Sequence, residues 1–291
     1  MRIALGVEYD GSPFCGWQSQ ADGQTVQDTL QLALSRIAGD QIASEQTAAG
    51  RISVVAAGRT DTGVHAFEQV VHFDTRAERP LNAWVRGVNA LLPDSIAVRW
   101  AHPVPDEFHA RFSAHGRSYR YLLINRDVRP AIHAGKVGWF HAPLDVAAMQ
   151  AAARLLIGEH DFSAFRAAQC QAKSPVKHLH RLDIRREGEM LIFDLSADAF
   201  LHHMVRNIVG CLVYVGKGKH PPSWMTEVLD SRERTFAAPT FAPDGLYLRR
   251  IQYEAKWGLP QSEDRGLFWS AQTRLRFESG DMSPHSIHPK G

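Results

Sequence analysis

A strand–helix–strand pattern occurs twice along the chain, and this repetition limits the possible folds more than any other feature. In the first half, apolar or alternating runs predict strands at residues 1–9, 52–57, 69–73 and 96–100. Apolar residues at helical spacing predict helices at residues 26–37 and 81–91. Thr25 directly precedes the first of these helices, and Asp28, three residues after Thr25, completes a capping-box pattern.

The second half follows the same plan. Strands are predicted at residues 117–124, 179–185 and 190–195, and helices from Asp145 to about Gly158 and at 201–215. Residues 186–189 connect two strands as a hairpin, and such hairpins argue against a parallel, doubly wound sheet. We therefore expect an α+β fold with two similar domains. Their sheets should be mainly antiparallel, flanked by helices and joined edge to edge.

Length and composition suggest the domain boundaries and the cell compartment. The chain has 291 residues, enough for an N-terminal domain at 1–105, a C-terminal domain at 106–260 and a polar, partly disordered tail at 261–291. Its three cysteines are far apart, which suits neither a disulfide framework nor a metal cluster and is typical of a reducing cytoplasm. No apolar run approaches the length of a membrane span, and residues 1–9 do not resemble a secretory signal. We expect a cytoplasmic protein.

The net charge of +2 does not by itself indicate a nucleic-acid partner, but the basic residues are clustered. One cluster lies between residues 166 and 186 and contains Arg166, Lys173, Lys177, Arg181, Arg185 and Arg186. Another consists of Lys217, Lys219 and His220. Such clusters can neutralise phosphates, but they can equally form a solvated protein surface. The charges alone leave both interpretations open.

The segment from Gly58 to Ala66, GRTDTGVHA, is the strongest candidate for a functional loop. It connects two predicted strands, where a rigid sheet can present Asp61 to a ligand. Arg59 favours the ionised carboxylate, which can act as a nucleophile or a base. Gly58 and Gly63 allow backbone angles that other residues resist. The alternative is an ordinary surface turn, since glycine, aspartate and threonine are common in turns.

A second candidate is the predicted helix that contains His202, His203 and Arg206. An arginine on an otherwise apolar helix requires a partner, and Asp61 is the acid that we expect to supply it. Adjacent residues on a helix point about 100° apart, so the two histidines should not easily share one metal ion. We expect no metal. A metal hydrolase that uses these histidines with His65 is the alternative.

A third candidate is the strand that carries Tyr119 and Tyr121 among arginines. Aromatic rings beside guanidinium groups on a sheet suit stacking against bases and contact with phosphates. Tyrosine is also a good strand former, and for Tyr121 we prefer that interpretation. The chain lacks a Walker loop, a dinucleotide-binding glycine pattern and a Gly-x-Ser-x-Gly elbow. A reaction without a cofactor fits these observations best.

Taken together, these motifs resemble those of the tRNA pseudouridine synthase A family. The similar segments occur in family order at residues 8–18, 56–73, 87–93, 108–121, 161–165, 200–210 and 244–248. The segment at about 40–52 is longer than usual for the family, and the tail beyond about residue 261 is not shared. Neither departure touches the motifs, so they affect expected loop contacts with tRNA and not the expected reaction.

The resemblance implies an isomerase that converts uridine to pseudouridine at positions 38, 39 and 40 of the tRNA anticodon stem-loop. It implies no cofactor and no metal, a homodimer that shares the tRNA between subunits, and an active-site cleft between the two domains. A non-catalytic RNA-binding protein with the same fold is the alternative. Pure binding would not require the carboxylate, which argues against that alternative.

The family's functional residues fall on particular positions of this chain. Asp61 corresponds to the catalytic nucleophile, Tyr119 to the active-site tyrosine, and Arg59 and Arg206 to the basic partners. Because the target uridine must be flipped out of its stack, Arg59 is expected to occupy the vacated space or hold a phosphate. Tyr119 should stack on the flipped base, and Leu246 should form a wall of the pocket. His203, Arg166 and Lys173 are the further expected tRNA contacts.

Overall fold

The computed structural model describes residues 1–39 and 52–260. The first half contains β1 (Arg2–Tyr9), α1 (Val26–Ala38), β2 (Val55–Ala56), β3 (His65–Asp74), η2 (Ala83–Gly87) and β4 (Ile96–Val104). The second half contains β5 (Ala114–Asn125), β6 (Gly138–Phe140), α2 (Val146–Arg154), β7 (Gly158–Asp161), η3 (Ser163–Phe165), β8 (Val176–Glu187) and β9 (Met190–Ala197). It ends with α3 (Met204–Gly216), α4 (Trp224–Ser231), β10 (Leu246–Tyr253) and η4 (Ala255–Trp257). The expectations for residues 40–51 and for the tail lie outside the described residues.

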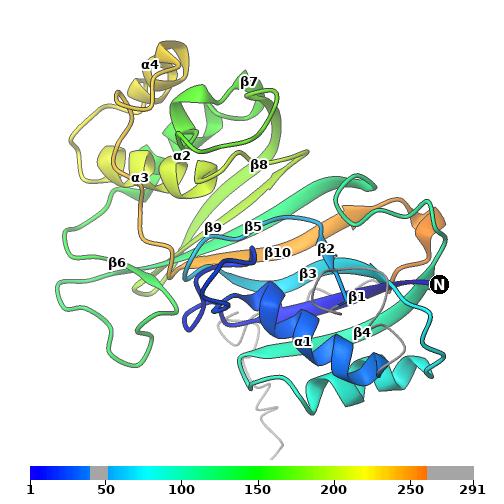
Figure 1. Ribbon diagram of the computed structural model, residues 1–291. Helices are drawn as coiled ribbons and strands as arrows, with labels where there is room; N and C mark the ends of the chain where they lie inside the picture. The colour runs from blue at the N-terminus through cyan, green and yellow to red at the C-terminus, as the bar shows by residue number, and fades with distance from the viewer. Residues whose placement is uncertain (40–51, 261–291) are drawn as a thin grey trace, which may run out of the picture. The chain divides into compact units, whose positions relative to one another are not determined.

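The strands form one ten-stranded sheet in the order β4-β1-β3-β10-β5-β9-β8-β7, with β2 paired to β3 and β6 paired to β5 (Figure 1). Within the described ranges, only the β10–β3 and β5–β6 pairs are parallel. The β1, β4, β8 and β9 pairings are antiparallel. This arrangement confirms the predicted α+β class with a mainly antiparallel sheet.

β10 connects the two halves of the sheet. It pairs in parallel with β3 and in antiparallel fashion with β5. Residues near the end of the described chain therefore lie between the two halves of the sheet. β10 is not among the strands predicted from the sequence, although Leu246, Leu248 and Ile251 are buried along it. The proposed boundary near residue 105 falls between β4 and β5 and stays a prediction.

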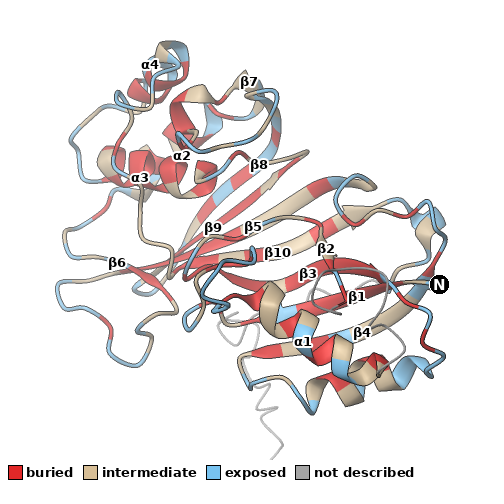
Figure 2. Cartoon of the chain, viewed as in Figure 1, coloured by how far each residue is buried: buried red, intermediate tan, exposed pale blue. Residues whose placement is uncertain are grey.

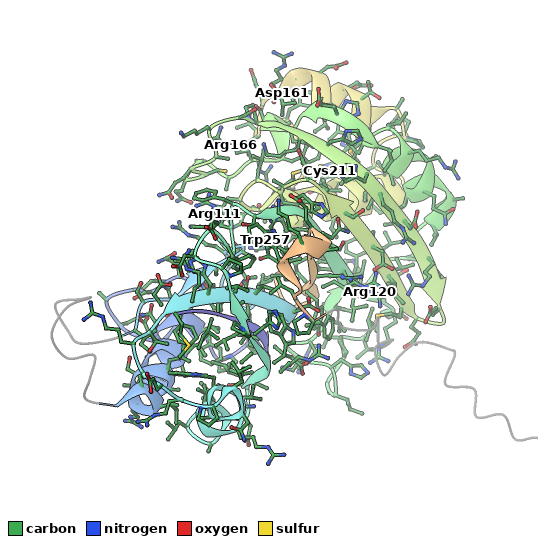
Figure 3. The ribbon with its side chains drawn as sticks, turned by 90° about the vertical axis from the view of Figure 1, so that its right-hand side faces the viewer. Arg111, Arg120, Asp161, Arg166, Cys211 and Trp257 are labelled. Atoms are coloured by element: carbon green, nitrogen blue, oxygen red, sulfur yellow. The ribbon has the colours of Figure 1, made fainter. Side chains whose placement is uncertain are left out.

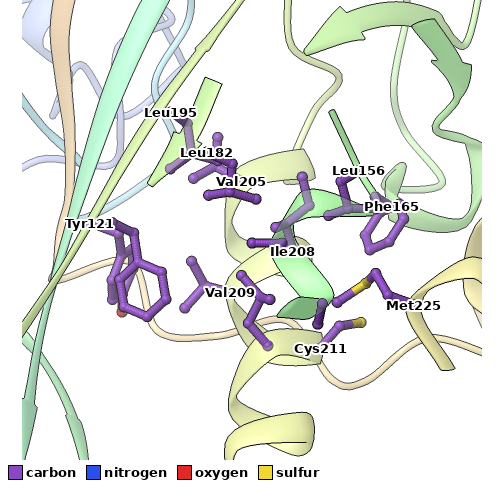
Figure 4. Close-up of a cluster of buried hydrophobic side chains, with 14 of the residues drawn as sticks. Tyr121, Leu156, Phe165, Leu182, Leu195, Val205, Ile208, Val209, Cys211 and Met225 are labelled. Atoms are coloured by element: carbon purple, nitrogen blue, oxygen red, sulfur yellow. The ribbon is translucent and has the colours of Figure 1, made fainter. Parts of the chain in front are cut away.

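Helices cover the sheet around two apolar cores (Figure 2). α1 belongs to the core of the first half, and its buried residues include Leu30 and Leu34. In the second half, Val205, Ile208 and Val209 of α3 lie between the sheet and a layer containing Phe165 (Figure 4). α3 is therefore held rigidly by packing on both sides, which fixes the backbone that carries the side chains at its N-terminal end.

Several element boundaries differ from the predictions. Thr25 caps α1 and accepts the Asp28 N–H at 3.2 Å, as the capping pattern indicated. The predicted strand at 52–57 is reduced to Val55–Ala56. Ile52 and Val54 donate their N–H groups to side chains of α1 instead of a neighbouring strand.

Both predicted helices of the second half are shorter than expected. The helix after Asp145 ends at Arg154. Gly158 begins β7, with a φ of 111°. The predicted 201–215 helix begins only at Met204, because His203 has a left-handed φ of 63°. None of the described helices is long and apolar enough to cross a membrane.

Candidate active site

Contacts with the start of the chain hold the loop between β2 and β3 in place. Trp17 donates its N–H to the Thr60 carbonyl at 3.0 Å, and the Tyr9 and Thr60 hydroxyls lie 2.7 Å apart. Val64 donates to the Asp61 carbonyl at 3.1 Å, which closes the turn around the carboxylate. Thr60 is buried, whereas the Asp61 side chain is 18% exposed. The loop is therefore anchored while it presents Asp61 to solvent.

Of the two glycines in this loop, one has the expected backbone role. Gly63 has a φ of +77°, a left-handed conformation that favours glycine. Gly58 lies outside that region, and a Cβ added to it would meet no atom within 4 Å. Gly58 therefore does not use the freedom that glycine allows, because the sharp reversal of the chain occurs after Asp61 and not before it.

His65, at the end of the loop, contacts two other segments of the chain and so connects three segments. Its Nδ1 accepts the Gly11 N–H at 3.1 Å, and its Nε2 lies 3.1 Å from the Asp244 carbonyl. Burial lowers the pKa of His65, which favours the neutral ring, with its proton on Nε2 donated to Asp244. The segment after β1, the start of β3 and the segment before β10 are connected in this way.

Asp61 itself contacts three basic side chains from the N-terminal end of α3. Arg206 donates from Nη1 to Oδ2 at 3.0 Å. His202 Nε2 lies 3.0 Å from Oδ1, and His203 Nε2 lies 3.3 Å from Oδ2. Arg206 also donates from Nε to the Phe241 carbonyl at 2.8 Å, which fixes its orientation. The Asp61–Arg206 contact expected from the sequence is confirmed.

The two histidines do not occupy helical positions, which corrects the argument made from the sequence. Both precede α3, and the left-handed turn at His203 brings their rings to a centroid distance of 4.1 Å. One ligand atom from each of Asp61, His202 and His203 lies within 4.8 Å of the others. The 100° separation assumed for a helix therefore does not apply, and this arrangement could hold a metal ion.

Tyr119 lies on β5 and packs edge-on against Phe200, with ring centroids 5.0 Å apart. Burial raises the pKa of Tyr119 to about 12, Arg117 opposes this rise, and the charge of Asp61 adds to it. Its hydroxyl is consequently protonated near neutral pH and able to donate. The hydroxyl of Tyr121, in contrast, donates to the Ala242 carbonyl. Its side chain is buried on β5, which agrees with its interpretation as a strand residue.

The structure places Arg59 differently from Arg206. Arg59 is exposed, and its Nη1 donates to Gln171 Oε1 at 3.2 Å. The guanidinium that contacts the Asp61 carboxylate is that of Arg206. Arg59 therefore lies at the exposed surface of the loop, where a polyanion can reach it, and not in the ion pair expected for it.

The remaining predicted contact residues lie in different environments. Leu246 is buried at the start of β10. Arg166, labelled in Figure 3, belongs to the second half of the chain. It donates to the carbonyls of Cys170 and Ala172 and so holds its own loop in shape. Lys173, in the same loop, is exposed. Lys173 is thus better placed than Arg166 for an electrostatic contact.

Arg117 has a positioning role that the sequence analysis did not identify. Its guanidinium donates to the carbonyls of Ala57, Arg111 and Asp198. These carbonyls belong to the base of the Asp61 loop, the β4–β5 connection and the segment that leads to His202. The strand sequence gives no signal for these partners, two of which, Ala57 and Asp198, are distant along the chain.

Comparisons with known proteins agree along most of the chain. The family model described as tRNA pseudouridine synthase matches residues 6–113 and 152–254. A tRNA pseudouridine synthase A from Dechloromonas aromatica is 59% identical over 264 residues, 91% of this chain and 97% of that protein. Another with this description, from Chromobacterium violaceum, is 62% identical over 276 residues, 95% of this chain and 100% of that protein.

Proposed function

The chain belongs to the tRNA pseudouridine synthase family and is thus an isomerase that acts on tRNA, and we propose that its targets are uridines 38, 39 and 40 of the anticodon stem-loop. We further propose that Asp61 is the nucleophile and that the reaction needs no cofactor. The observation that carries this proposal is the contact between the Asp61 carboxylate and Arg206 at 3.0 Å, in a site open to solvent.

The reaction is an internal rearrangement. The bond between uracil N1 and the ribose C1′ breaks, the base turns, and C5 forms a new bond to the same carbon. C5 loses a proton and N1 gains one, so the product has the composition of the substrate. A carboxylate can attack the ribose, attack the base, or assist loss of a ribose proton, and Asp61 is suited to each of these steps.

The groups around Asp61 supply the remaining requirements. Arg206 and its bond to Phe241 hold the carboxylate and a compensating charge in fixed positions, which is electrostatic preorganisation. The protonated Tyr119 hydroxyl is available to donate during proton transfer, and its ring is available to stack on uracil. Exposed Arg59 is suited to fill the space that the flipped nucleotide leaves, and Leu246 to close one wall of the pocket.

The basic residues of the second half are the proposed tRNA surface. Exposed Lys173 and the Lys217–Lys219 pair would neutralise phosphates. His203 would contact the nucleotide beside Asp61. We propose a homodimer that shares one tRNA. Light scattering would test this by measuring the mass of the free protein and of its tRNA complex.

Mapping of pseudouridine in tRNA incubated with the protein tests the proposed function directly. We expect new pseudouridine at positions 38–40 and at no other uridine. Modification elsewhere would overturn the site assignment. Incubation with a chelator should not reduce the rate, and a loss that zinc or magnesium restores would overturn the cofactor-free reaction.

A further inference from the structure

We propose that Asp61, His202 and His203 form a binding site for a transition-metal ion of the zinc type, and that occupation of this site reversibly inhibits the enzyme. The binding part of this inference stands on geometry alone. The inhibitory part rests on the proposed role of Asp61 as the nucleophile.

Three observations define the site. The ligand atoms of the three residues lie within 4.8 Å of one another, and both Nε2 atoms already face the carboxylate, at 3.0 and 3.3 Å. The side chains of His202, His203 and Asp61 are 38%, 27% and 18% exposed, so an ion can enter. An ion at about 2.0–2.2 Å from each ligand atom needs only small movements of these side chains.

The ligand types determine which ions fit. Two imidazoles and one carboxylate suit zinc, cobalt, nickel and copper, and three protein ligands leave a position open for water or substrate. Magnesium requires oxygen ligands at nearly ideal octahedral geometry, which this set does not supply. The magnesium that accompanies tRNA should therefore not occupy the site.

Arg206 opposes metal binding and gives the inference a directional test. Its guanidinium contacts Oδ2, the carboxylate oxygen that also faces His203, so the ion and the arginine compete for the charge of one carboxylate. The bond to Phe241 can hold Arg206 nearby while the carboxylate turns to the metal. The ion neutralises the negative charge of a metal-bound Asp61, and the carboxylate has also lost its arginine partner, so it is a poor nucleophile towards a uridine.

Titration of the full-length protein with zinc chloride, and separately with cobalt chloride, tests the binding part. Calorimetry should show a zinc site that magnesium does not occupy, and cobalt should give the absorption bands of a tetrahedral complex. His202→Gln and His203→Gln should each weaken zinc binding by at least about tenfold, because each removes one of three ligands. Zinc affinity that is unchanged in both variants would overturn the inference.

A matched control is available in a second imidazole pair. The rings of His178 and His180 lie 4.5 Å apart on the exposed side of β8. The double variant H178Q/H180Q removes two imidazoles, one more than either single variant, and should still retain the zinc and cobalt signals of the active site. Loss of both signals in this variant would place the metal on β8 and overturn the assignment.

The second test exploits Arg206. Arg206→Gln should bind zinc more tightly than the unmodified protein, even though it forms little pseudouridine, because a competing cation is removed. A general loss of structure would weaken zinc binding and not strengthen it. Circular dichroism of each variant identifies any variant that is unfolded, and Arg206→Lys then repeats the comparison with the charge retained.

Inhibition is measured as initial pseudouridine formation over a zinc series at constant magnesium, followed by a chelator. We expect loss of activity in proportion to site occupancy and full recovery with the chelator. Full activity at saturating zinc would overturn the inhibitory part.

If zinc binds as expected while Asp61→Ala remains active, the metal site stands and the proposed nucleophile fails. If Asp61→Ala is inactive and zinc does not bind, only the metal inference fails.

Discussion

Asp61 is the residue whose charge the proposed reaction requires. Asp61→Asn preserves the shape of the side chain but removes the negative charge that contacts Arg206. We expect pseudouridine formation to fall by at least about a thousandfold, since the nucleophile is removed. Single-turnover kinetics with tRNA would measure this decrease.

Binding of tRNA provides the control for this variant. Filter binding should give a dissociation constant close to that of the unmodified protein, because phosphate contacts do not depend on Asp61. Turnover near the unmodified rate would contradict the nucleophile assignment. The same measurement on Asp61→Ala, which also removes the contacts with His202 and His203, shows whether the shape of the side chain matters.

The two glycines of the active-site loop form a matched pair for a stability test. In Gly63→Ala the new Cβ would lie 3.1 Å from Pro243 Cγ, on a backbone with a φ of +77°. We expect the free energy of unfolding to decrease by about 1–2 kcal/mol. Gly58→Ala should change it little, since its Cβ would meet no atom within 4 Å. Denaturant unfolding of both variants makes the comparison, and equal decreases would contradict the assigned backbone roles.

At the scale of elements, β3 carries a buried acid that links stability to pH. Burial raises the pKa of Glu68 from 4.5 to about 7, and the nearby charges of Arg250 and Arg99 only partly oppose this. Between these pH values the folded protein holds a proton that the unfolded chain releases. The contribution of Glu68 to the free energy of unfolding therefore falls as the pH rises from 4.5 to 7.

Glu68→Gln removes this pH-dependent contribution. We expect the variant to have a higher free energy of unfolding than the unmodified protein at pH 8, by up to about 3 kcal/mol, and no such advantage at pH 4. Urea unfolding at both pH values measures the difference. Glu159→Gln, at an exposed position of β7, is the control and should show no such pH dependence. An advantage of Glu68→Gln that is the same at both pH values would exclude titration as its cause.

Most element types followed from local pattern, whereas their exact ends did not. The Thr25 cap of α1 and the hairpin of β8 and β9 were predictable because the residues that define them are neighbours in the chain. The short length of β2 could not be predicted, since Ile52 and Val54 donate to side chains of α1. The late start of α3 could not be predicted either, because local spacing does not reveal the left-handed turn at His203.

At the scale of the whole molecule, the proposed tRNA surface predicts a dependence of affinity on salt. Lys173→Ala and the double variant K217A/K219A should each weaken tRNA binding and reduce the slope of log affinity against log salt. The expected reduction is about 0.7–0.9 for each phosphate that a lysine no longer neutralises. Lys256→Ala is the control, because that lysine already pairs with Glu254 at 2.8 Å. An unchanged slope would remove the tested lysines from the tRNA surface.

The α+β class, the loop that carries Asp61 and the family motifs could be predicted from the amino-acid order, because periodicity and short motifs are properties of adjacent residues. Which groups meet at the carboxylate depends on the folded arrangement of distant segments. Arg206 lies 145 residues from Asp61, and of the two arginines expected there it is this one, not Arg59, that makes the contact. The insertion of β10 between β3 and β5 and the turn before α3 also bring His202 and His203 to the same site. Contacts between distant segments depend on how the elements pack, and no local pattern encodes that packing.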